Sequence, residues 1–156
     1  MRTLATGQPS RFRIVAPILA LLGACGGPAG DPEASVRAWV ERGEAAAESK
    51  DRRALAGMIS PAYADARGNG RDEIDDLLRF YFLRQQTVSL LVRIERLEIV
   101  GESAAELDLQ VGMAGGNDNL LGFSARAYRF DMELEREDGD WFLIAARWAE
   151  LGDEVH

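Results

Sequence analysis

The spacing of hydrophobic residues changes near residue 86, and this change divides the chain into a helical part and a strand part. Before it, apolar residues recur every three or four positions, which predicts amphipathic helices. Asp51 precedes the second of these segments as a helix cap, and Pro61 follows its end. The residues expected on the apolar faces are Val36, Trp39, Val40, Gly43, Ala46 and Ala47 in the first helix, Leu55, Met58 and Ile59 in the second, and Ile74, Leu77, Leu78 and Tyr81 in the third.

After Gln86 the hydrophobic pattern has a period of two, which predicts long strands with one apolar face. The pattern slips once, at Glu95–Arg96, and a turn at 101–103 and the hairpin sequence "EDGD" separate the strands. The last segment, "WFLIAARWAEL", is apolar on both faces, which indicates a central or covered strand. The alternating apolar residues are Val88, Leu90, Val92, Ile94, Leu97 and Ile99, then Ala105, Leu107, Leu109, Val111 and Met113, then Tyr128, Phe130, Met132 and Leu134.

Three helices followed by antiparallel strands predict an α+β fold. The helices cannot bury their apolar stripes on one another alone, so we expect them to pack on the apolar face of the sheet. A strongly twisted sheet of this kind curls around its helices and leaves a conical space.

The first 24 residues have the pattern of a secretory signal. Three arginines and no acidic residue precede "IVAPILALLGA", an apolar run of 11 residues. A membrane-spanning helix needs about 20 apolar residues, so this run is too short to remain as an anchor. The alternative, a buried first helix, lacks the expected polar face. Residues 1–24 are therefore interpreted as a lipoprotein signal peptide.

Cys25, the only cysteine, ends the sequence "LGAC", which resembles the bacterial lipobox. In a lipobox the cysteine receives a diacylglycerol group and becomes the first residue of the mature chain. The alternative is ordinary signal cleavage that leaves a free thiol. We expect residues 25–34 to be a lipidated cysteine with a Gly/Pro tether, and 35–156 to form the folded domain. Gly26 after the cysteine resembles the signal for sorting to the outer membrane, facing the periplasm of a bacterial envelope.

Charge limits the partners of the predicted mature protein. The whole chain has a net charge of −8, and without the three arginines before residue 25 it has 15 basic and 26 acidic residues, a net charge of −11. This balance disfavours nucleic acids and anionic lipid surfaces. Membrane attachment is expected through acyl chains, at about 0.8 kcal/mol per buried methylene.

The strand pattern with "DGDWFLIAARW" at its end, and "SPAYADARGNGRDEIDDLLRFYF" before it, resemble the NTF2-like (SnoaL-like) superfamily from Ser35 to Leu151. The resemblance implies a cystatin-like cone of three helices on a curved sheet. It also implies a short strand between the second and third helices, for which "AYADARG" is the candidate. The family includes dehydratases, isomerases and epoxide hydrolases, and members that only bind ligands or partners, so the fold alone does not identify an activity.

Five polar residues are candidates for lining the cone. Tyr63 and Asp65 lie in the region that the family uses near the mouth of its pocket, and Arg126 shares the strand phase of Phe130. For the tyrosines, core packing with the hydroxyl at the edge is the alternative. The single histidine, His156, is the last residue, so no histidine-based pair is expected. The pocket candidates are Tyr63, Asp65, Tyr81, Arg126 and Tyr128.

The segment from Asp65 to Asp76 aligns with the sequence of a calcium-binding loop, but poorly. An arginine replaces a ligand at the third position and a shorter aspartate replaces the last glutamate. A turn with Gly68 and Gly70 at positive φ, followed by a helix capped by Asn69, is the simpler interpretation. We therefore expect no metal and no cofactor. The aligned residues are Asp65, Arg67, Asn69, Gly70 and Asp76.

Three hypotheses for function follow. The first is an envelope lipoprotein whose domain binds a small apolar ligand or a protein partner without catalysis. The second is an isomerase or dehydratase with Asp65 as base and a tyrosine as hydrogen-bond donor. The third is a structural subunit of an envelope assembly, with the acidic sheet face of Asp131, Glu133 and Glu135 as its interface, the same sheet through which a homodimer could form.

Overall fold

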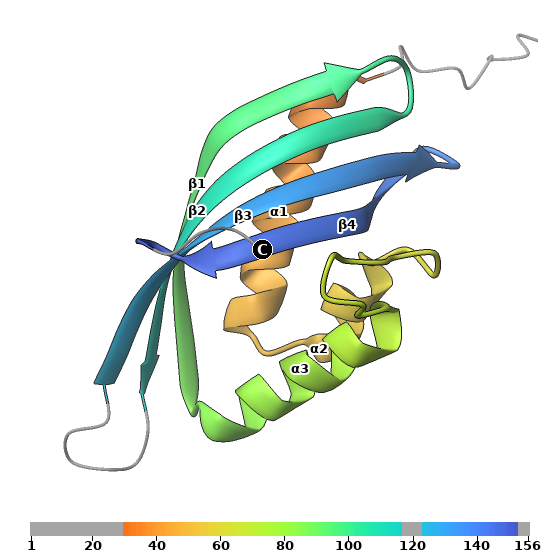
Figure 1. Ribbon diagram of the computed structural model, residues 1–156. Coiled ribbons are helices and arrows are strands. Elements are labelled where there is room, and N and C mark those ends of the chain that lie inside the picture. The colour runs from red at the N-terminus through yellow and green to blue at the C-terminus, as the bar shows by residue number, and fades with distance from the viewer. Residues whose placement is uncertain (1–29, 117–122, 153–156) are drawn as a thin grey trace, which may run out of the picture.

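Helices cover one face of an antiparallel four-stranded sheet in the computed structural model, which describes residues 30–116 and 123–152 (Figure 1). This arrangement confirms the α+β prediction. The predicted signal peptide, Cys25 and most of the tether lie outside the described residues. The elements are α1 (Pro32–Glu48), α2 (Arg52–Gly57), α3 (Arg71–Arg84), β1 (Thr87–Val100), β2 (Ala104–Gly116), β3 (Phe123–Glu137) and β4 (Asp140–Glu150).

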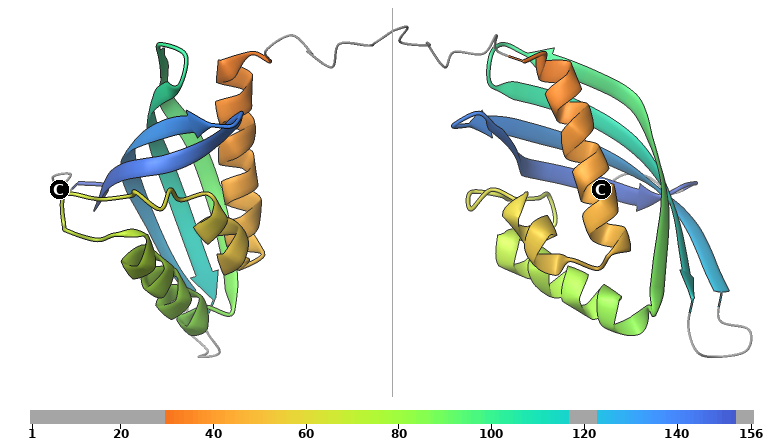
Figure 2. Two further views of the ribbon diagram at one scale, coloured as in Figure 1. Left: turned by 90° about the vertical axis from the view of Figure 1, so that its right-hand side faces the viewer. Right: turned by 180° about the vertical axis from the view of Figure 1, so that it is seen from behind.

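The helix α1 lies along the sheet, and its cap fixes where it begins (Figure 2). The Asp31 carboxylate accepts a hydrogen bond from the Glu33 amide at 3.0 Å, so the helix starts three residues before the expected Ser35. The Ser35 hydroxyl in turn accepts a bond from Trp141 Nε1 at 2.7 Å, which joins α1 to β4. The buried residues of α1 are Val36, Trp39, Val40 and Ala46.

The two shorter helices pack against each other. Asp51 caps α2 as predicted, accepting a bond from the Ala54 amide at 2.9 Å. The cap of α3 is Gly70, whose amide donates to Glu73 Oε2 at 2.9 Å. Gly70 has a φ of −95°, so the expectation of a positive φ there and of a cap at Asn69 was wrong.

The strands pair in the order β1-β2-β3-β4. The register of β1 on β2 shifts between Ile94 and Arg96, which confirms the predicted slip. Asp138 and Gly139 both have positive φ, 50° and 95°, as the tight hairpin between β3 and β4 requires. The alternating apolar residues thus share one face of the sheet, here called the inner face because it faces the helices.

The strand β4 is at the edge of the sheet order, but it is covered. Main-chain hydrogen bonds run from Ser60 N to Leu143 O at 2.9 Å and from Ala64 N to Ile144 O at 3.1 Å. The segment 58–64 therefore takes the place of the short strand that the resemblance implied. A register shift at Glu133/Leu134 also changes the phase of β4, which explains why its sequence is apolar on both faces.

Candidate functional site

Three aromatic side chains form a continuous row on the inner face, where β3 and β4 pair. The ring centroids of Tyr128 and Phe130 are 6.3 Å apart, and those of Phe130 and Trp148 are 6.4 Å apart with planes inclined by 24°. Phe130 and Trp148 are directly paired in the sheet register, so the pairing fixes their contact. All three are only partly buried. We call Tyr128, Phe130 and Trp148 the aromatic row.

An arginine lies at each end of the aromatic row. The guanidinium of Arg67 is 4.6 Å from the centre of the Trp148 ring, and its Nη2 donates to the Trp148 carbonyl at 3.0 Å. At the other end, Arg126 Nη1 donates to the Tyr128 hydroxyl at 3.5 Å. The row is therefore an apolar surface with a cationic group at both ends.

Tyr81 on α3 belongs to the same cluster. Burial raises the pKa of its hydroxyl, and the nearby Tyr128 adds to this effect while Arg126 opposes it. Hydrogen bonding to Tyr128, and attraction to Tyr128 and Glu150, raise the pKa of Arg126. The structure thus brings three of the five predicted pocket residues, Tyr81, Arg126 and Tyr128, into one electrostatically coupled group.

Tyr63 lies in the segment that covers the β4 edge and is 4% exposed. Its hydroxyl has no hydrogen-bond partner among the described residues. Burial raises its pKa to about 12, and the neighbouring Asp65 carboxylate contributes. The phenol is therefore protonated at neutral pH, with its hydroxyl near the Asp65 carboxylate.

The Asp65 carboxylate organises its own loop. Oδ1 accepts bonds from the amides of Arg67 and Asn69 at 2.9 and 2.8 Å, and Oδ2 accepts one from Asn69 Nδ2 at 2.8 Å. Burial acts to raise the pKa of Asp65, but these hydrogen bonds outweigh it and lower the pKa. The turn also uses Gly68 at a φ of 81°, as predicted. The Asp65 carboxylate is therefore ionised, and its oxygens are engaged in hydrogen bonds that shape the loop holding Arg67 over Trp148. Its lowered pKa also makes it a weak proton acceptor.

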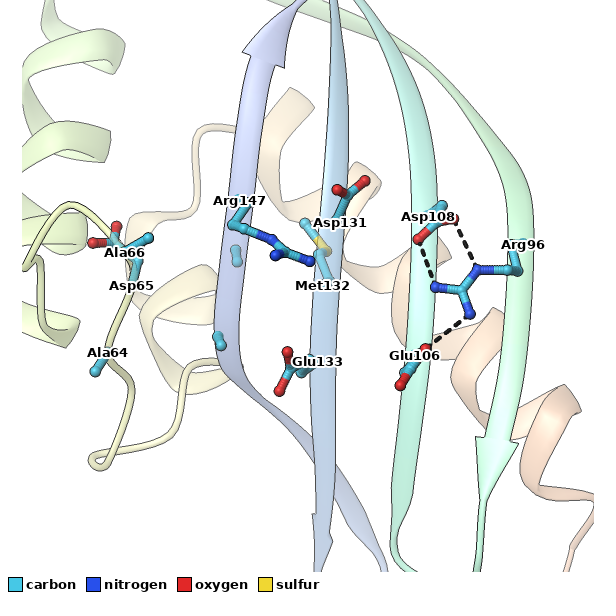
Figure 3. A pocket seen from close by; sticks show the side chains of 12 residues that line it. Ala64, Asp65, Ala66, Arg96, Glu106, Asp108, Asp131, Met132, Glu133 and Arg147 are labelled. Atoms are coloured by element: carbon cyan, nitrogen blue, oxygen red, sulfur yellow. Dashed lines mark hydrogen bonds and ion pairs between the residues drawn. The ribbon is translucent and has the colours of Figure 1, made fainter. Parts of the chain in front are cut away.

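The opposite, outer face of the sheet is charged. Arg96 Nε donates to Asp108 Oδ2 at 2.9 Å, and its Nη1 donates to Glu106 at 2.8 Å (Figure 3). Arg147 extends across β3 on the same face, near Asp131 (Figure 3). The predicted acidic strip of β3 is thus interspersed with arginines.

Two shallow depressions of about 270 and 410 Å³ follow these outer charges. Both depressions lie on the outer face of the sheet in the described part of the chain. Neither of them is therefore the conical space that was expected on the inner face. Arg96, Asp108, Asp131 and Arg147 line both of them.

Other kinds of site find no support in the described part of the chain. No three or more His, Cys, Asp or Glu residues there are grouped to hold a metal ion. None of the helices in the described ranges is long and apolar enough to cross a membrane.

Two residues at one end of the aromatic row, Trp148 and Arg67, were not predicted as site residues from the sequence. Trp148 was not among the five pocket candidates, and Arg67 was considered only as a misfit in a calcium loop. The phase of Tyr128 and Phe130 was visible in the sequence, but the pairing of Phe130 with Trp148 depends on the register shift in β4.

Comparison with known proteins shows which fold the domain has. No protein-family model and no curated protein matches the chain. Among solved structures, a dehydratase-like member of the NTF2-like family from Streptomyces avermitilis is similar, with a TM-score of 0.66 and 12% identity over 77% of this chain and 96% of that one.

Two further structures are similar over most of their length. A ketosteroid isomerase-like protein from Erwinia carotovora atroseptica has a TM-score of 0.64 and 13% identity, over 80% of this chain and 99% of that one. A hexachlorocyclohexane dehydrochlorinase from Novosphingobium barchaimii has a TM-score of 0.63 and 16% identity, over 79% and 88%. The domain therefore has the NTF2-like fold that the family resemblance implied.

Proposed function

We propose that this protein is a lipid-anchored protein of the bacterial envelope whose NTF2-like domain binds a small, apolar, preferably planar molecule without transforming it. The observation that carries the proposal is the partly exposed aromatic row between Arg67 and Arg126. A planar apolar ligand over Phe130 and Trp148 would gain about 0.5–1.5 kcal/mol per aromatic contact beyond the burial of its surface.

The arginine at the Tyr128 end favours a ligand with a polar acceptor group. Arg126 is exposed, and the only hydrogen bond of its guanidinium to another described residue is a long one of 3.5 Å to Tyr128. A carboxylate or carbonyl oxygen of a ligand would accept a shorter, charge-assisted bond there. The tyrosines would supply further donors, so an apolar body with one acceptor at its end is the ligand class that fits best.

The environment of Asp65 supports binding rather than catalysis. Isomerases that remove a proton next to a carbonyl need a carboxylate with free lone pairs facing the substrate. Asp65 is committed to three hydrogen bonds within its loop and has a lowered pKa. It therefore fits the role of positioning Arg67 better than the role of base.

An isomerase or dehydratase remains the second hypothesis, because Tyr63 has a buried, protonated hydroxyl with no hydrogen-bond partner among the described residues. Two fold neighbours are also named for such reactions. Under this hypothesis a ligand recovered with the protein would be chemically altered on incubation, and Tyr63→Phe would stop the change. An unaltered ligand would contradict it.

Ligand binding is tested by titrating the full chain with the aromatic probe anilinonaphthalene sulfonate and following its fluorescence. Phe130→Ala and Arg126→Ala are each expected to weaken binding about tenfold, since each removes a stacking or charge-assisted contact. Arg129→Ala, on the outer face of the same strand, and Leu83→Ala, on the exposed side of α3, are the matched controls. Equal losses in all four variants would contradict the proposal.

Anchoring at Cys25 is tested in cells. We expect Cys25→Ser to abolish both membrane retention and labelling by radioactive fatty acid, because the thiol is the atom that receives the lipid. Normal labelling of this variant would contradict the lipoprotein assignment. Separation of inner and outer membranes of the unmodified strain tests the expected outer-membrane position.

A further inference from the structure

One side of α3 exposes a stripe of large apolar residues that nothing in the described chain covers. Leu77, Phe80 and Leu83 are 50%, 58% and 77% exposed. They are three of the six large hydrophobic residues that are strongly exposed among the described residues. The opposite side of the helix is the one that packs: Ile74 lies against the core, and Asp75 pairs with Arg52 of α2. The exposed side is therefore not needed to hold α3 in place.

The stripe is symmetric about Phe80. Leu77 and Leu83 lie three residues before and after it, and Asp76 and Arg84 lie four residues before and after it. Residues three and four apart share one side of a helix, so these five positions form a single surface. Asp76 and Arg84 are exposed, and neither forms an ion pair with another described residue. We call Asp76, Leu77, Phe80, Leu83 and Arg84 the α3 surface.

We propose that the α3 surface is the contact through which two copies of this chain associate. In an antiparallel pair of α3 helices related by a two-fold axis at Phe80, each residue meets the one at the same distance on the other side of the axis. Leu77 then meets Leu83 of the second copy, and Asp76 meets Arg84 of the second copy. The apolar centre is thus closed at both ends by opposite charges.

Self-association fits this surface better than a membrane does. The first turn of α3 carries Asp72 and Glu73, and Asp76 lies within the stripe itself, so a lipid headgroup layer would meet carboxylates beside the apolar residues. Of these carboxylates, Asp76 has a complementary partner, Arg84, in a second copy. The antiparallel arrangement also aligns the helix dipoles favourably.

The outer sheet face offers less for self-association. Arg96 on that face already binds carboxylates of its own chain, so a second copy would have to compete with these contacts or bury them. A single pair of helices is smaller than the roughly 1,200 Å² typical of stable interfaces, so the dimer is expected to be weak and to depend on concentration.

The test is a charge exchange measured by sedimentation velocity on the full chain in a mild nonionic detergent. Asp76→Arg and Arg84→Asp are each expected to weaken dimerisation about tenfold, because two symmetry-related pairs become repulsive at once. The double variant Asp76→Arg/Arg84→Asp restores both pairs and is expected to dimerise like the unmodified chain. Only a pairing of position 76 with position 84 predicts this recovery.

Phe80→Glu places two carboxylates on the axis and is expected to give a monomer. Leu91→Ala, a strongly exposed residue on the outer sheet face, is the control and should leave the dimer unchanged. Circular dichroism of each variant shows whether α3 remains folded, so that loss of the dimer is not loss of the helix.

Three results would overturn the proposal. These are a chain that stays monomeric at all concentrations, a dimer that Phe80→Glu leaves intact, and a double variant as weak as the single ones. Binding of the full chain to phosphatidylcholine vesicles that is lost in Phe80→Glu, without any dimer, would show instead that the α3 surface contacts lipid. None of these results depends on ligand binding at the aromatic row, which the Phe130→Ala titration tests separately.

Discussion

The two faces of the sheet are built from the same strands and have opposite chemistry. Along β3 the residues that point inward are Tyr128, Phe130, Met132 and Leu134, and those that alternate with them are Arg129, Asp131, Glu133 and Glu135. Some of the outer charges bind one another, as Arg96 does with Asp108. The inner face contains the core at one end and the partly exposed aromatic row at the other. Stability and recognition thus share the inner face, while the outer face mainly keeps the sheet soluble.

The largest expected contrast between the faces is in stability. Leu107 on β2 is 0% exposed on the inner face, and Gln110 lies three residues further on the outer face. Leu107→Ala leaves a cavity and is expected to lower the free energy of unfolding by about 2–5 kcal/mol. Gln110→Ala should change it by no more than about 0.5 kcal/mol. Urea unfolding followed by tryptophan fluorescence measures both, and similar values would contradict the assignment of the two faces.

Two glycines on β2 sharpen the same comparison by steric fit. A Cβ at Gly115, on the inner face, would lie 2.4 Å from Gln85 Oε1, whereas one at Gly112, on the outer face, would lie 3.6 Å from Leu91 Cβ. Gly115→Ala must displace the Gln85 side chain, and we expect a loss of about 1–3 kcal/mol.

Gly112→Ala is the matched control for this substitution. It meets only ordinary van der Waals contact and should be neutral or stabilising by up to about 1 kcal/mol, because alanine restricts the unfolded chain. Urea unfolding distinguishes the two variants. If both were neutral, Gln85 would not be packed on Gly115.

The faces themselves were predictable from the sequence, because a period of two requires only that one side of the sheet be buried. Even the slip at Glu95–Arg96 was visible, since a bulge leaves its mark in the hydrophobic pattern. The position of β4 was harder to infer. This strand has apolar residues on both sides because its register shifts and because segment 58–64 covers its edge. Neither feature can be recognised from the residues next to it in the sequence.

The candidate site was only partly predictable for the same reason. Arg126 and Tyr128 share a strand phase, so the pattern placed them on one face. Arg67 reaches Trp148 across 81 positions in the chain, through a loop that Asp65 shapes by hydrogen bonds. Local sequence could identify the loop but not the ring that it approaches. The exposure of Leu77 was also unexpected, because an apolar stripe predicts burial and does not say what buries it.

A smaller expected effect concerns the loop that closes the inner face at Trp148. Hydrogen bonds lower the pKa of Asp65 in the folded protein, so its contribution to stability is present above the pKa of the unfolded chain. It is lost as the pH falls through the lower, folded value. Asp65→Asn should therefore be less stable at neutral pH, and its difference from the unmodified chain should shrink in acid.

Urea midpoints measured from neutral to acidic pH test this expectation. Glu102→Gln is the control, because the carboxylate of this exposed turn residue accepts no hydrogen bond from another described side chain or amide. A difference for Asp65→Asn that is independent of pH would mean that the loop depends on shape and not on the charge of the carboxylate.

The smallest expected effect is on the outer face. Arg96 is exposed and binds Asp108, Glu106 and Glu98. Ion pairs in such surroundings gain little, since water and salt screen both partners. Arg96→Ala should lower the urea midpoint less than Leu107→Ala, Gly115→Ala or Asp65→Asn, and the loss should fall further as sodium chloride is added. Probe binding at the aromatic row should not change. A large effect that resists salt would mean that the outer face, and not only the inner one, carries the stability of the sheet.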